Sequence, residues 1–190
     1  MLFIKQKSKK ECVFLVVFTG IFQIDMAQKL LVITPTMASK YFIMKKVVYK
    51  EGDIFLISLG DKIFTGLIVK RKEKSKILLG YFWPIQINTG NDFLNTVLSI
   101  PPILIRQFSG LGFDLGRWKV IGRLLEWDSN NWPVPEFKKK DFFTNNYYAV
   151  QYDDDLEFMN ERLITFKEAS HLFEDGLSGF EALETRLLSL

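Results

Sequence analysis

The sequence is poor in the residues that most often build catalytic and metal-binding sites. Its 190 residues include one cysteine, Cys12, and one histidine, His171. A single cysteine excludes an intramolecular disulfide and a cysteine metal cluster, and it suits a protein of the reducing cytoplasm. A single histidine excludes multi-histidine zinc sites and gives no support to a Ser-His-Asp triad. Because His171 stands beside Leu172 in a predicted helix, we interpret it as a half-exposed helix residue.

The chain also lacks a strong net charge. Its formal charge is +3, and residues 1–25 contribute +2 of this through four lysines against Glu11 and Asp25. The remainder is nearly neutral, whereas a nucleic-acid-binding protein normally has a strongly basic, clustered surface. Two lysine-rich runs, 70–76 and 138–140, lie in predicted loops. They leave a nucleic-acid-binding module, using a basic and aromatic barrel face, as an alternative function.

No convincing membrane span is present near the start of the chain. The apolar run from Cys12 to Phe22 is shorter than the roughly 20 residues that a spanning helix needs. It follows several lysines, as in a signal peptide, but the first small residue after it is Ala27. We therefore interpret residues 1–36 as an N-terminal extension: a signal-like segment, a buried strand, or the result of a start codon assigned too early. Residues 37–190 are predicted to form a single β-rich domain.

Apolar runs separated by turn residues indicate a series of β-strands. Gly60 and Asp61 stand between two such runs and indicate a hairpin. Asn91 or Asp92 caps a predicted short helix, and the glycines of 109–116 indicate a loop. The predicted strands are 54–59, 63–69, 77–83, 103–108, 118–124 and 145–152.

The C-terminal part changes to helical spacing. Thr165 with Glu168 and Ser178 with Glu181 are capping-box patterns, and they predict two short helices. Gly176 is expected to end the first helix, and Gly179 to open the second. Together with the strands, these elements predict an α+β fold. We expect a bent antiparallel sheet or SH3-like barrel of about five to six strands, with the C-terminal helices packed on it.

An acidic run is the densest cluster of carboxylates. It consists of Asp153, Asp154, Asp155 and Glu157. The run lacks the spaced oxygen donors and central glycine of an EF-hand, so we interpret it as a solvated loop and predict no metal site. Two alternatives stay open: a metal-dependent hydrolase that uses these carboxylates, and an acidic contact surface for a basic partner such as a nuclease.

The aromatic residues and three short phrases point to a binding protein. Aromatic residues make up 15% of the chain, and tryptophan and tyrosine dominate binding hot spots. The phrases are Glu51–Phe55 leading to Leu59–Asp61, then Gly116–Gly122, then Trp132–Phe137. In this order they resemble Immunity protein 26, a bacterial family of polymorphic toxin systems, over roughly residues 46–150.

This resemblance implies a cytoplasmic immunity protein that binds and neutralises a cognate toxin. It implies no enzymatic turnover and no cofactor, and a toxin protein as the partner. The alternative interpretation of the family-pattern residues is structural: turns formed by Gly-Asp pairs, a core tryptophan, and an arginine that pairs with a carboxylate. The positions that carry the pattern are Asp53, Asp61, Arg117, Trp118, Trp132 and Phe137.

Overall fold

The computed structural model describes residues 5–8, 11–14, 47–86, 96 and 100–190. The chain divides into two compact units, 1–46 and 47–190. In the first unit, β1 (Lys5–Ser8) pairs antiparallel with β2 (Glu11–Phe14). The predicted domain boundary after residue 36 lies outside the described residues, as does the predicted helix after Asn91 apart from Thr96. No helix in the described part of the chain is long and apolar enough to span a membrane.

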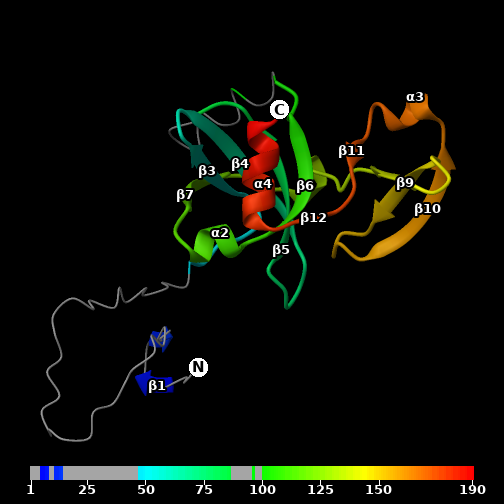
Figure 1. Ribbon diagram of the computed structural model, residues 1–190. Helices are drawn as coiled ribbons and strands as arrows, with labels where there is room; N and C mark the ends of the chain where they lie inside the picture. Colours follow the sequence, from blue (N-terminus) through cyan, green and yellow to red (C-terminus); the bar gives the residue numbers. More distant parts are fainter. Residues whose placement is uncertain (1–4, 9–10, 15–46, 87–95, 97–99) are drawn as a thin grey trace, which may run out of the picture. The chain divides into compact units, whose positions relative to one another are not determined.

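The second unit is built around a bent, six-stranded sheet (Figure 1). The strand order is β12-β6-β5-β4-β3-β7; neighbouring strands are antiparallel except for β12, which joins β6 in parallel. The prediction of a bent sheet of five to six strands is confirmed, and this sheet does not close into a barrel. The strands are β3 (Asp53–Leu59), β4 (Lys62–Arg71), β5 (Ile77–Trp83), β6 (Leu104–Ser109), β7 (Trp118–Arg123) and β12 (Leu177–Ser178).

Both faces of the six-stranded sheet are buried because apolar residues occupy both sides of its central strands. On one face, Phe55 packs against the rings of Phe82, Phe108 and Trp118. Gly66 lies opposite Phe55 in the ladder, and a Cβ there would come within 2.3 Å of the Phe55 ring. The glycine therefore makes room for the aromatic core.

A C-terminal helix covers this aromatic face. Helix α4 (Phe180–Leu188) lies across the sheet in Figure 1 and buries Leu183 and Leu187 completely. Each of these leucines contributes about 1.5–3 kcal/mol by leaving water. The predicted opening of this helix at Gly179 is confirmed.

A second sheet projects to the side of the first, and we call residues 137–172 the arm (Figure 1). The sheet order is β10-β9-β8-β11, with β11 parallel to β8 and the other pairs antiparallel. At the root of the arm, Phe137 and Leu156 are buried in one cluster with Ile54 and Leu67 of the six-stranded sheet. The strands are β8 (Phe137–Lys140), β9 (Tyr147–Tyr152), β10 (Phe158–Ile164) and β11 (Phe173–Glu174).

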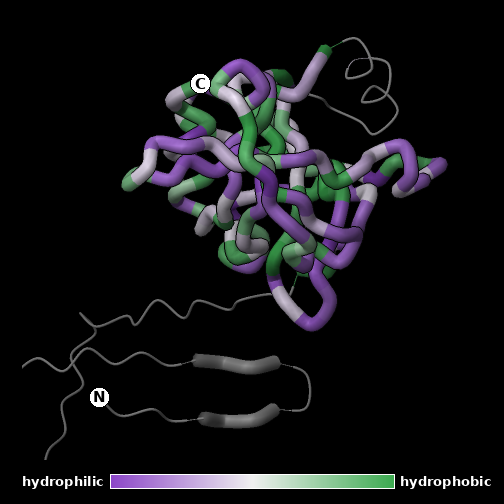
Figure 2. The backbone as a smooth tube through the Cα atoms, turned by 90° about the vertical axis from the view of Figure 1, so that its right-hand side faces the viewer, coloured by the Kyte–Doolittle hydropathy of each residue, from purple (hydrophilic) through white to green (hydrophobic). Residues whose placement is uncertain are grey.

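Short elements complete the unit. Helix α2 (Leu111–Asp114) lies in a segment predicted to be a loop, and the 3-10 turn η1 (Ser129–Asn131) precedes the arm. Helix α3 (Phe166–Ala169) begins with the predicted capping box, in which Thr165 and Glu168 exchange hydrogen bonds. Along the coloured, described part of the unit, hydrophobic and hydrophilic stretches alternate on the backbone (Figure 2).

Three details of the C-terminal prediction are wrong. Ser178 does not cap α4, because its hydroxyl oxygen accepts a hydrogen bond from Arg106 Nε at 2.6 Å. Gly176 lies between β11 and β12, where it adopts a positive φ of 127°, and does not end α3. His171 follows α3 in an exposed turn and is not part of a helix.

Candidate partner-binding site

The two family-pattern aspartates lie at opposite ends of β3. Asp53 is buried, and its Oδ2 accepts a hydrogen bond from the Lys50 backbone N–H at 2.7 Å. Burial raises the pKa of Asp53, although this hydrogen bond opposes the shift. Asp61 is exposed in the turn between β3 and β4. Asp53 therefore holds a turn in place, whereas Asp61 is accessible to a partner.

Arg117 and Trp118 bind the same carboxylate on α4. The Arg117 guanidinium donates to both oxygens of Glu184, at 3.0 and 2.5 Å, and Trp118 Nε1 donates to Oε1 at 3.0 Å. Arg117 also lies over the Phe180 ring at 5.5 Å. Trp118 is buried, while the Arg117 side chain is 50% exposed. The pair fastens α4 to the edge strand β7, and Arg117 keeps an accessible face.

Trp132 and Phe137 lie where the chain enters the arm. Trp132 is half-buried and meets Tyr81 and Trp83 edge-to-face, at 5.7 and 6.3 Å between ring centroids. Burial raises the pKa of Tyr81 to about 12, so its hydroxyl stays protonated and donates to the Pro133 carbonyl oxygen at 2.7 Å. Phe137 is buried in the shared core. Of these two aromatic residues, Trp132 has the accessible surface.

The acidic run lies in the turn between β9 and β10, so the prediction that it follows the last strand is wrong. Two of its carboxylates form ion pairs with lysines at the end of β4 or just after it: Asp154 with Lys70, and Glu157 with Lys72, both at 2.8 Å. The Asp153 side chain accepts hydrogen bonds from the backbone N–H groups of Asp155 and Glu157. Three of the four acidic side chains therefore make contacts with other groups of the same protein. The described residues contain no cluster of three or more side chains able to hold a metal ion.

The lysine-rich runs were predicted to lie in loops, but they lie partly in strands. Several of their lysines also contact neighbouring side chains. Residues 138–140 belong to β8, and Lys70 is a buried residue of β4. Lys76 pairs with Asp114, Lys139 pairs with Glu161, and Lys140 lies over the Tyr147 ring. This arrangement gives no specific support to a nucleic-acid-binding face.

An accessible apolar group at the end of the arm was not anticipated. Phe142 and Phe143, in the turn between β8 and β9, are 84% and 99% exposed. Together with Tyr148 they line an open hollow of about 290 Å³. Leu163, 63% exposed, is the cross-strand neighbour of Tyr148 on the same face. We call Phe142, Phe143, Tyr148 and Leu163 the tip patch. Two adjacent phenylalanines in a turn-rich stretch were the available sequence signal.

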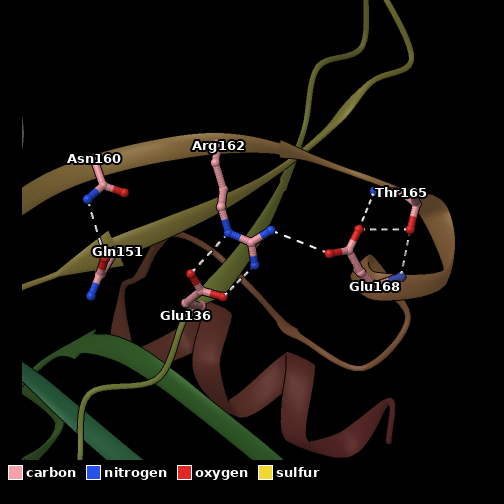
Figure 3. Close-up of polar contacts among 6 residues, drawn as sticks. All are labelled: Glu136, Gln151, Asn160, Arg162, Thr165 and Glu168. Carbon is pink, nitrogen blue, oxygen red and sulfur yellow. Dashed lines mark hydrogen bonds and ion pairs between the residues drawn. The ribbon is translucent and has the colours of Figure 1, made fainter.

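A network of polar contacts links the elements of the arm (Figure 3). Arg162 of β10 pairs with Glu136 and Glu168, at 3.0 and 3.4 Å, and so joins the entry to β8 with α3. Thr165 donates its backbone N–H to Glu168, and this hydrogen bond lowers the pKa of Glu168. Asn160 donates to Gln151 across β10 and β9 at 3.3 Å. The strands that carry the tip patch are thus fixed to one another.

Comparison with known proteins gives one match. A family model described as Immunity protein 26 matches residues 50–149, more than half of the chain. The matched span runs from the turn before β3 to the first residues of β9, and β10, α3 and α4 lie beyond it. No match was found among curated proteins or among solved structures. The family agrees with the resemblance carried by the three sequence phrases.

Proposed function

Because the chain belongs to the Immunity protein 26 family, we propose that it neutralises a cognate bacterial toxin by direct protein–protein contact. The observation that carries this proposal is the family match across residues 50–149, which contain five strands of the six-stranded sheet. The protein acts by occupying the toxin, with no turnover and no cofactor. It acts in the cytoplasm of the cell that produces the toxin.

The fold suits an inhibitor that works by contact. Such a protein needs an ordered surface, because side chains and loops that are already fixed lose little entropy on binding. The lock between Arg117 and Glu184 and the network around Arg162 provide this order. Among the family-pattern residues, we assign partner contact to Asp61, Arg117 and Trp132, and a scaffold role to Asp53, Trp118 and Phe137.

The first test is co-purification of the full chain with the product of a neighbouring toxin-like gene. We expect a stoichiometric complex in which the toxin loses its activity as the immunity protein is added. A toxin that neither binds nor loses activity under these conditions would refute the proposal. Random oligonucleotides serve as the comparison, since salt-sensitive binding to them would favour the nucleic-acid-binding alternative instead.

The acidic run adds an expectation about the class of toxin. We propose a nuclease, because the basic surface with which a nuclease binds its substrate complements acidic side chains. Asp154, Asp155 and Glu157 are all exposed, and Asp155 contributes its backbone N–H, not its carboxylate, to the local turn contact. Degradation of DNA or RNA by the purified toxin, suppressed by the immunity protein, is the expected result. A toxin with another activity would overturn this narrower expectation and leave the main proposal standing.

A further inference from the structure

The turn at the end of the arm is built to hold its phenylalanines in water. Asp141 Oδ1 accepts a hydrogen bond from the Phe143 backbone N–H at 2.9 Å, and Oδ2 accepts one from Thr144 Oγ1 at 2.7 Å. The Asp141 backbone N–H donates to the Asn146 carbonyl oxygen at 2.9 Å, and Asn145 takes a positive φ of 58°. The hydrogen bonds that its carboxylate accepts from Thr144 and Phe143 lower the pKa of Asp141. An ordered turn that presents two apolar rings is preorganised for contact.

The tip patch is a contiguous group, which distinguishes it from isolated exposed residues. Tyr148 lines the same hollow as Phe142 and Phe143, and Leu163 stands beside Tyr148 in the sheet. Single exposed apolar residues are common on protein surfaces, but grouped ones with a polar rim mark interaction sites. Here the rim is polar, because Lys139 and Glu161 border the hollow. The patch thus has the anatomy of a small interface core.

The charge around the patch indicates what kind of surface covers it. Segments 138–148 and 158–168 carry five basic and three acidic side chains, a net charge of +2. If two copies of this chain met tip to tip, their like charges would repel each other. This disfavours a second copy as the molecule that covers the tip patch. A partner surface with carboxylates around an apolar pocket would complement both the charge and the rings.

The outer edge of the arm is less suited to binding a partner strand. Edge strand β10 carries a register shift between Phe158 and Asn160, and its next residues are the charged Glu161 and Arg162. Bulges and charges are the features by which proteins protect an edge against strand addition. Side chains at the tip, and not the backbone of the edge, are therefore the accessible binding elements.

We propose that the tip patch is a docking surface for the toxin, with Phe142 and Phe143 entering an apolar pocket rimmed by carboxylates. The acidic run lies at the other end of β9 and meets a separate, basic part of the toxin. This inference rests on the proposed function. Lys140, next to the turn, faces the acidic rim and speeds association. Asp141 acts as a positioning residue, because it touches the turn and not the partner.

The test measures affinity for the product of the neighbouring toxin-like gene, beginning with the unmodified chain. If that chain does not bind, the proposed function itself fails. If it binds, the double variant Phe142→Ser/Phe143→Ser should bind at least about 100-fold more weakly, since buried aromatic anchors carry much of an interface's binding energy. Equal affinity of the double variant and the unmodified chain would overturn the docking proposal while leaving the proposed function intact.

Three further variants make the result specific. Leu125→Ser removes an apolar side chain that is 84% exposed outside the arm, and it should change affinity by less than about threefold. Lys140→Glu should slow association about tenfold at low salt, with a smaller effect at high salt. Asp141→Ala should weaken binding by loosening the turn. If Leu125→Ser loses as much affinity for the toxin as the double variant does, the assignment of toxin binding to the tip patch is overturned.

The same proteins are used to check that the variants fold and to test whether something other than the toxin covers the tip patch. Because Phe142 and Phe143 are exposed, the double variant should keep the urea midpoint of the unmodified chain. Size exclusion of the unmodified chain should give a monomer; a dimer that the double variant abolishes would identify a second copy as the occupant and overturn the proposal. The double variant is also tested for binding to anionic lipid vesicles. If it loses vesicle binding but keeps toxin binding, the proposal is overturned, and the tip patch binds a membrane surface instead.

Discussion

Glu184 connects the C-terminal helix to Arg117 and to the start of β7. Its carboxylate accepts three hydrogen bonds, two from Arg117 and one from the buried Trp118 indole. Glu184→Ala leaves that indole N–H without its acceptor, and we expect the free energy of unfolding to fall by about 2 kcal/mol. Urea denaturation followed by tryptophan fluorescence measures the change.

Two controls separate this lock from a general effect on α4. Glu184→Gln keeps an acceptor for Trp118 but removes the charge that pairs with Arg117, so it should cost less than the alanine variant. Glu181→Ala changes an exposed residue of the same helix and should cost no more than about 0.5 kcal/mol. Equal losses for Glu181→Ala and Glu184→Ala would contradict the lock.

Asp53 gives a prediction about pH. Because burial raises its pKa, the folded state binds a proton at this residue more tightly than the unfolded chain does. Stability contributed by Asp53 is therefore highest below the unfolded pKa, near 4, and is lost as pH rises through the raised folded value. Asp53→Asn can still accept from Lys50 and does not ionise. Relative to the unmodified protein, this variant should gain stability as pH rises above about 4.

The urea midpoints of both proteins are compared at each pH, so that the contributions of the other carboxylates cancel. Asp61→Asn makes the same chemical change in an exposed turn and serves as the control for the loss of a carboxylate. If the difference in urea midpoint between Asp53→Asn and the unmodified chain stays constant as pH rises above about 4, the burial argument is wrong.

At the scale of the element, the sequence predicts strands well where apolar runs are continuous. Strands β3, β4 and β5 are largely buried on both faces, and their sequences are correspondingly apolar. Strand β10 was missed because six of its seven residues are exposed, which leaves no alternation to detect. Strand β8 was missed because three lysines follow Phe137, and β11 and β12 are too short for any pattern.

The candidate site shows the same limit. Trp118 and Phe137 are readable as family-pattern residues, but their burial also depends on partners more than 20 residues away in the sequence. Glu184 lies 66 residues from Trp118, so a single sequence gives no sign that they meet. Likewise, the exposure of Phe142 and Phe143 follows from the projection of the arm, which only the tertiary structure reveals.

The turn between β9 and β10 is fastened to β4 by an ion pair that can be tested. Lys70 has a side chain only 7% exposed, whereas its partner Asp154 is 81% exposed. Asp154→Asn leaves the lysine buried beside a neutral group, and we expect a loss of about 1 kcal/mol. Asp155→Asn removes the same charge from the next residue and should be close to neutral. In urea denaturation, the difference between the two variants should shrink as salt is added; a reversed order would contradict the ion pair.

At the scale of the whole unit, one short segment joins the two sheets. Residues 173–178 supply β11 to the arm and β12 to the six-stranded sheet, so each sheet gains an edge strand from the same stretch of chain. Arg106 of β6 holds this segment through hydrogen bonds to the carbonyl oxygens of Glu174 and Asp175, at 3.0 and 3.3 Å. Together with the shared core around Phe137, this connection should prevent the arm from unfolding alone.

The arm and the six-stranded sheet should therefore unfold as one cooperative unit. Phe137→Leu weakens the shared core, and we expect it to lower the free energy of unfolding by about 1 kcal/mol for both parts. Tryptophan fluorescence reports on the six-stranded sheet through Trp83 and Trp118, and hydrogen exchange of the β9 amides reports on the arm. Both probes should shift to lower urea concentration together, whereas Phe142→Ser at the exposed tip should move neither. Loss of β9 protection well before the fluorescence transition would mean that the arm unfolds independently, and the tip patch would then be presented by a flexible element that must become ordered on binding the toxin.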